Sequence, residues 1–201
     1  MWALIEAQYD KYSPIRFNDW GINYYIDYPI TNTRLIFVDT GDTRDVDGTS
    51  GIFYTDYEGY ADALMQSGNK NIIIIAHAVD TNSIGTRLCR IANHYNNRAL
   101  CETSYLTYDF SEATGHVYVV IGGHGHVDMM ATPTEGGISW IMTDCDALIS
   151  HTTTIEVDGE EVDFSPVIGT VTEQAFDVVT VNFNTGITKC VRIGRGVDRQ
   201  I

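Results

Sequence analysis

Two kinds of hydrophobic pattern alternate along the first half of the chain. Short continuous apolar runs at 34–39 and 71–76 are typical of strands that are covered on both faces. Segments 56–65 and 83–97 instead place apolar residues at helical spacing, and Gly68 follows the first of them as a stop signal. This half of the chain therefore predicts two strands, each followed by a helix.

After Gly115 the pattern changes to that of strands joined by tight turns, marked by Asp158-Gly159 and by Asn184-Thr185-Gly186. Alternating β and α followed by mostly β predicts an α/β fold, a layered β-sandwich flanked by helices, with residues 1–201 as a single domain. The expected strands are 21–28 near the start, then 116–121 and 138–143, the hairpin 152–157 with 161–164, and the hairpin 176–183 with 187–193.

Composition narrows the class of protein. With 201 residues, 44% hydrophobic and 19% charged, the chain has enough apolar material for a folded core. Its net charge of −15 repels phosphate backbones, so we expect no nucleic-acid binding. A phosphorylated small molecule remains a candidate substrate if metal ions invert the local field.

Targeting and cysteine signals indicate the cytoplasm. No apolar run approaches the roughly 18 residues needed to span a bilayer, so no membrane association is expected. The start of the chain carries Glu6 and Asp10 and lacks the layout of a signal peptide. The four cysteines are scattered without a C-x-x-C pair, which favours reduced, mostly buried thiols.

Histidines follow two of the predicted buried strands. The run at 71–76 ends directly in His77, and the strand at 116–121 leads into Gly122-Gly123-His124-Gly125-His126-Val127-Asp128. Ligands bind outside the carboxyl ends of strands in open α/β sheets, and the glycines let the backbone turn sharply there. Three imidazoles at one point are a ligand set that suits Zn, Mn or Fe. Asp128 is available to orient one histidine by accepting a hydrogen bond from the ring nitrogen that does not bind the metal.

These residues carry a resemblance to a known family. G-H-x-H after a buried strand, preceded by another strand that ends in histidine, resembles the last two motif blocks of the calcineurin-like metallophosphoesterases. The order of Tyr24-Tyr25-Ile26-Asp27, Arg34-Leu-Ile-Phe-Val-Asp-Thr, helix and strand is similar to that superfamily. The ending, from Glu173 through Arg192-Ile-Gly-Arg-Gly-Val-Asp-Arg, is similar to a branch common in Firmicutes and their phages.

The resemblance implies that the chain is the C-terminal part of such a domain. His77 and His124 would then bind one metal of a binuclear centre, and His126 would bind the other. The family hydrolyses phosphate monoesters or diesters with two divalent ions, which generate the attacking hydroxide and stabilise charge on the phosphoryl oxygens.

The first three motif blocks of the family are not found. D-x-H is absent, and Asn69 is followed by Lys70, so G-N-H is absent as well. Gly41-Asp42-Thr43-Arg44-Asp45 spells G-D-x-x-D, which makes Asp42 a candidate pocket carboxylate, although its context favours an acidic surface loop. Two cations need a bridging anion. Three neutral imidazoles therefore predict little or no phosphatase activity from this chain alone.

A missing first half also has consequences for assembly. Strands such as 71–76 would lose their neighbours, so we expect self-association or a partner that supplies the N-terminal half. An alternative function is a catalytically silent binding or assembly module, for instance in a phage particle. A cupin-like site with one metal on three histidines is a third hypothesis, which the helices and the β–α order disfavour.

Overall fold

The computed structural model describes residues 14–17, 23–40, 42–43, 53–79, 84–123, 128–131, 138–143, 153–157 and 160–201. A seven-stranded mixed sheet forms its centre, in the order β1-β2-β3-β6-β9-β11-β10. The four strands β3, β6, β9 and β11 run parallel to one another, and β2 and β10 flank them in antiparallel orientation. The strands of this sheet are β1 (Ile15–Arg16), β2 (Tyr24–Tyr28), β3 (Thr33–Val38), β6 (Asn71–Ala78), β9 (His116–Gly123), β10 (Met129–Ala131) and β11 (Ser139–Met142).

Two α-helices, α2 (Tyr57–Met65) and α3 (Ile84–Asn96), pack on one face of this sheet. Asp56 caps α2 by accepting a hydrogen bond from the backbone of Gly59 at 2.9 Å. The helices connect β3 to β6 and β6 to β9, so each strand is added on the same side of its predecessor. Crossovers of one constant hand require both helices to lie on the same face, as they do here.

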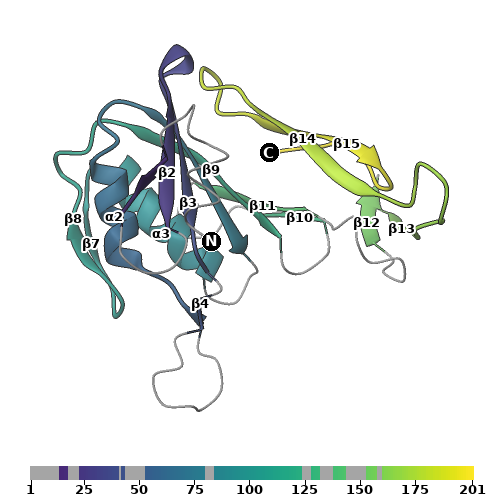
Figure 1. The fold of residues 1–201 in the computed structure, drawn as a ribbon, viewed down its shortest axis with the longest axis horizontal. Helices are drawn as coiled ribbons and strands as arrows, with labels where there is room; N and C mark the ends of the chain where they lie inside the picture. The colour runs from purple at the N-terminus through teal and green to yellow at the C-terminus, as the bar shows by residue number, and fades with distance from the viewer. Residues whose placement is uncertain are drawn as a thin grey trace.

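A small antiparallel sheet packs on the opposite face. It consists of β14 (Ala175–Val181), β15 (Thr188–Gly194) and β16 (Arg199–Gln200). Cys190 of β15 is fully buried against Val119 and Ile141 of the main sheet. Figure 1 shows the helices on the left and this C-terminal sheet at the upper right. The layers are therefore helices, main sheet and second sheet.

Three two-stranded ribbons and one 3-10 turn complete the described elements. The ribbons are β4 (Asp42–Thr43) with β5 (Phe53–Tyr54), β7 (Leu100–Glu102) with β8 (Thr107–Asp109), and β12 (Thr153–Val157) with β13 (Glu160–Phe164), and the 3-10 turn is Pro29–Thr31.

The strand and helix predictions are confirmed in their type and close to their bounds, and the α/β layered architecture is confirmed with them. Residues 158–159, expected as a hairpin turn, lie outside the described residues. The expectation that 71–76 would lack neighbours is wrong. β6 is a central strand, with β3 on one side and β9 on the other, because the chain itself supplies both. None of the described helices is long and apolar enough to cross a membrane.

Candidate functional site

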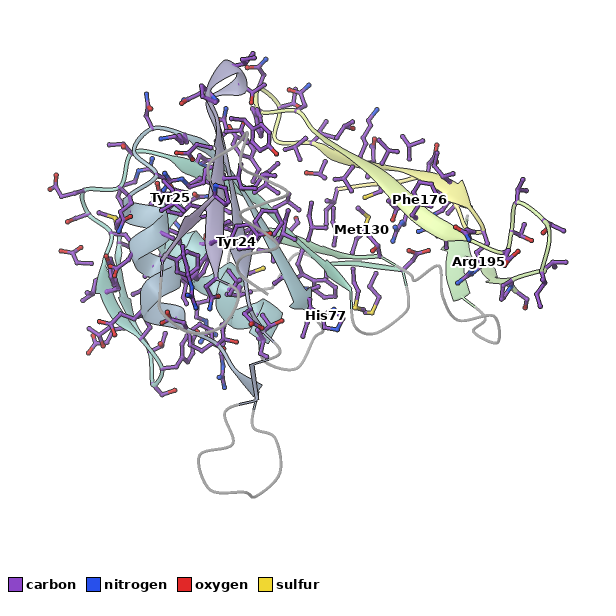
Figure 2. The ribbon with its side chains drawn as sticks, viewed as in Figure 1. Tyr24, Tyr25, His77, Met130, Phe176 and Arg195 are labelled. Atoms are coloured by element: carbon purple, nitrogen blue, oxygen red, sulfur yellow. The ribbon has the colours of Figure 1, made fainter. Side chains whose placement is uncertain are left out.

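The carboxyl ends of β3, β6, β9 and β11 lie at one edge of the main sheet, because these strands are parallel. We call this the carboxyl edge. His77 is the penultimate residue of β6, and its side chain is exposed. Its neighbours Ala76 and Ala78 are buried, and Ala76 packs toward the helices. His77 is thus an exposed residue between two buried alanines at the end of β6 (Figure 2), where the pairing with β9 is irregular between Ile75 and Ala78.

The end of β9 lies beside His77. Gly123 pairs with Ala78 of β6, and the Gly122 carbonyl accepts a hydrogen bond from the Thr143 amide at 3.0 Å. A Cβ on Gly122 would lie 2.4 Å from the Ala76 carbonyl oxygen, so glycine is required for this close approach. His124 and His126 lie outside the described residues, and their predicted role as ligands stays a prediction.

The chain after β3 is fixed to the end of β6 at the same edge. The Cα of Val38 pairs with that of Ala76, and the hydroxyl oxygen of Thr40 accepts a hydrogen bond from the Ala78 amide at 2.8 Å. Asp39 lies between Val38 and Thr40, as His77 lies between Ala76 and Ala78. No functional role is predicted for Asp39 from the sequence. Its position is nevertheless visible in the sequence, because Asp39 ends the apolar run at 34–39. His77 follows the apolar run at 71–76 in the same way.

Asp128 belongs to a buried cluster of four charged side chains. It forms ion pairs with Arg192 and Arg199, the second at 2.9 Å, and both arginines also bind Asp177. The side chains of the two aspartates are at most 1% exposed, and those of the arginines at most 9%. This cluster, called here the ionic cluster, joins the start of β10 to the C-terminal sheet.

The ionic cluster pairs two negatively charged aspartates with two positively charged arginines. Burial works to lower the pKa of Arg192, but hydrogen bonds and charge from Asp177 and Asp128 outweigh it and raise the pKa above its ordinary value. Arg192 also donates to the Arg195 carbonyl at 2.7 Å. Asp128 therefore fixes the chain just after the G-H-x-H segment. Its predicted role in orienting a histidine stays a prediction.

Asp42 lies in β4, beyond the carboxyl edge (Figure 1). Its backbone pairs with Tyr54 of β5 in an antiparallel ribbon that is separate from the main sheet. The structure describes the backbone of Asp42 and not its carboxylate. Its role as a pocket carboxylate stays a prediction.

A cavity of about 800 Å³ lies at the opposite edge of the molecule, between the start of β6 and the turn that joins β14 to β15. Its polar lining is engaged locally. The Asn182 side-chain oxygen accepts from the amides of Asn184 at 2.9 Å and Thr185 at 3.2 Å, and Asn71 donates to the Thr31 carbonyl at 3.4 Å. We therefore keep the candidate site at the carboxyl edge, where β6 ends at His77 and β9 leads into the G-H-x-H segment.

Within the described ranges, no group of three or more His, Cys, Asp or Glu side chains could hold a metal ion. The described residues contribute His77 and, one strand away, Asp39 to the carboxyl edge. Of the three predicted histidine ligands, only His77 belongs to the described residues, so the metal centre stays a prediction.

The architecture defines an α/β layered protein, with helices on one face of a mixed sheet and a small antiparallel sheet on the other. No protein-family model matches the chain, and neither a curated protein nor a solved structure does.

Proposed function

We propose that the chain is the C-terminal part of a metal-dependent phosphoesterase, with residues 1–201 as one domain and a divalent-metal site at the carboxyl edge. One observation carries the proposal: β6 and β9, the two strands that lead into His77 and into the G-H-x-H segment, are parallel neighbours. Gly123, the residue before His124, pairs with Ala78, the residue after His77.

The chemistry assigned to this edge is the hydrolysis of phosphate monoesters or diesters. His77, His124 and His126 would hold Mn²⁺, Fe²⁺ or Zn²⁺, and the complete site of the family takes two ions. Such ions lower the pKa of bound water and offset negative charge on phosphoryl oxygens. The positive charge of the metal ions would allow a chain of net charge −15 to bind a phosphorylated substrate.

A cytoplasmic location is part of the proposal. Cys89, Cys101 and Cys190 are buried free thiols. Burial raises the pKa of Cys89 to about 12 and that of Cys190 to about 11. Free thiols are typical of a reducing compartment, and thiols of such high pKa are inert.

Metal binding is the first test of the proposal. We expect the purified, metal-free chain to bind Mn²⁺ in isothermal titration calorimetry, and we expect His77→Ala to lose most of that affinity. His116→Ala is the matched control, because His116 begins β9 at the opposite edge of the same sheet. Equal binding by the wild type and His77→Ala, or no binding by the wild type, would refute the site.

Activity is the second test. The chain alone should hydrolyse p-nitrophenyl phosphate and its bis-ester slowly or not at all with Mn²⁺, because the D-x-H and G-N-H blocks are absent from it. Addition of a polypeptide that carries those blocks should raise the rate. Rapid turnover by the chain alone, abolished by His124→Ala, would show that its ligand set is already sufficient.

A catalytically silent binding or assembly module is the second candidate. The lack of the D-x-H and G-N-H blocks in the sequence favours it. A silent module should bind no Mn²⁺ in a His77-dependent manner and should show no rate increase with an added N-terminal half. The two tests above therefore separate the two functions.

A further inference from the structure

β14 is an edge strand of the C-terminal sheet. The order of that sheet is β14-β15-β16, so β14 has a neighbour on one side only among the described strands. It runs from Ala175 to Val181 and pairs with β15 without a break in register. Long, regular edge strands readily pair with a further strand, and proteins commonly block this with a proline, a lysine or a bulge. β14 contains none of the three.

The hydrogen bonds of the hairpin show which backbone groups of β14 point to its free side. Just beyond β14, the Asn182 amide donates to the Ile187 carbonyl of the other arm at 2.9 Å. In an antiparallel pair, only every second residue bonds to the partner strand. The residues that bond to β15 are therefore Phe176, Val178 and Thr180. The amides and carbonyls of the residues between and after them, Asp177, Val179 and Val181, point to the free side.

The two long strands of the hairpin carry little of the acidic charge of the chain. The net charge is −15, but Asp177 is the only acidic residue of β14 and β15. Its side chain is 1% exposed and is paired with Arg192 and Arg199. The remaining charged residue of the two strands, Lys189, is positive. Two copies of the chain can therefore meet along β14 without bringing unpaired carboxylates of these strands together.

We propose that β14 pairs in antiparallel orientation with β14 of a second copy of this chain. A pair centred on Val179 sets Asp177 opposite Val181 of the second copy, so that the amides and carbonyls on the two free sides bond to one another. The same pairing brings Phe176 and Val178, each 48% exposed, against the second copy (Figure 2). The same strand then forms both halves of the interface, which closes around a two-fold axis.

A pair of lysine variants tests whether the edge or the outer face forms the interface. Val178 and Val191 are direct partners across the hairpin and are 48% and 44% exposed. Either substitution by Lys adds one positive charge, but only Val178 lies in the edge strand. In sedimentation equilibrium, we expect Val178→Lys to raise the Kd of the dimer at least about tenfold more than Val191→Lys does.

A pair of variants at Val179 tests the backbone directly. The Val179 amide points to the free side, so Val179→Pro removes a donor of the proposed interface and no hydrogen bond of the hairpin. Val179→Ala also loses packing against the cluster that contains Cys190, but it keeps the amide. We expect Val179→Ala to form dimers and Val179→Pro to stay monomeric at the same protein concentration. Thermal unfolding checks that both variants are folded.

Three results would each overturn the pairing. The first is a wild type that stays monomeric at every concentration, which would leave the edge to a strand of another protein. The second is an equal effect of Val178→Lys and Val191→Lys, because stacking of the outer faces would require both residues. The third is a folded Val179→Pro that dimerises as Val179→Ala does. If Val179→Pro does not fold, the comparison of the two lysine variants decides. The proposed metal site is independent of all these outcomes.

Discussion

Asp128 and Arg192 form an ion pair that is almost completely buried between the main sheet and the C-terminal sheet. Asp128 is the residue before β10, and Arg192 lies in β15, 64 positions further along the chain. The pair therefore fixes how the second layer is placed on the first. It does so five residues after Gly123, the last residue of β9.

Removing one charged side chain from the ionic cluster should lower the free energy of unfolding. Asp177 accepts hydrogen bonds from Arg192 at 2.9 and 3.1 Å and also pairs with Arg199. Asp177→Asn leaves two buried guanidinium groups with one carboxylate. We expect the free energy of unfolding to fall by about 3–5 kcal/mol in urea denaturation. Lys189→Gln, an exposed change in the same sheet, should stay within about 0.5 kcal/mol, and equal effects would contradict this account.

Gly122 and Gly123 give a second, internally controlled prediction. A Cβ at Gly122 would lie 2.4 Å from the Ala76 carbonyl oxygen and 2.5 Å from a methyl group of Val79, whereas a Cβ at Gly123 meets nothing within 4 Å. Gly122→Ala should therefore destabilise the protein by about 1–3 kcal/mol through overpacking. Gly123→Ala should have a much smaller effect. Thermal unfolding of the two variants side by side measures the difference.

Much of the fold could be predicted from the sequence because its signals are local. The apolar runs and helical spacings of the first half, and the turn residues of the last hairpin, depend on near neighbours in the chain. The sequence does not predict β1, β10 and β16, because strands of two or three residues are too short to show a hydrophobic pattern. It does not predict the place of β6 between β3 and β9 either, because both pairings join segments that are far apart in the sequence.

The site shows the same division. His77 at the end of a buried strand could be predicted, because an apolar run followed by a polar residue is visible in the sequence. The ion-pair partners of Asp128 could not be predicted, because Arg192 and Arg199 contact it only when the C-terminal sheet packs on the main sheet. The place of Asp39 beside His77 needed the register of β3 against β6, which no local pattern encodes.

Acid should weaken the ion pair between Asp27 and Arg34. Arg34 donates two hydrogen bonds to the Asp27 carboxylate, at 2.7 and 2.8 Å. Partial burial works to raise the pKa of Asp27, but the hydrogen bonds and charge of Arg34, with a smaller contribution from Lys70, leave it below its ordinary value. A carboxyl whose folded pKa is lowered contributes stability above its unfolded pKa of about 3.9. That contribution is lost as pH falls through the folded pKa.

We therefore expect the free energy of unfolding to decline as the pH falls below about 4, and we expect Asp27→Asn to reduce the slope of that decline. Urea denaturation at a series of pH values measures both. At pH 7 the same variant should be less stable than the wild type, because the buried Arg34 loses its charged partner. An unchanged acid slope in Asp27→Asn would show that other carboxyls dominate the acid response.

The outer face of the β14–β15 hairpin is the apolar surface on which we expect self-association to depend. Phe176 pairs with Ile193, and Val178 pairs with Val191. Each of these side chains is between 44% and 48% exposed. Two apolar cross-strand pairs thus face solvent in a chain whose surface is otherwise strongly acidic. Contact between copies would bury them, while the net charge of −15 opposes the approach.

Sedimentation velocity across a range of protein concentrations tests this prediction. The wild type should associate more strongly in 0.5 M than in 0.05 M NaCl, because salt screens the repulsion between acidic chains. Replacing Val178 and Val191 together by Thr keeps β-branched residues in both strands and should leave the protein monomeric. The control is Val167→Thr, which changes a residue 54% exposed outside the hairpin and should associate like the wild type. A wild type that stays monomeric at every concentration and salt level would contradict the prediction, because the exposed pairs would then need no partner.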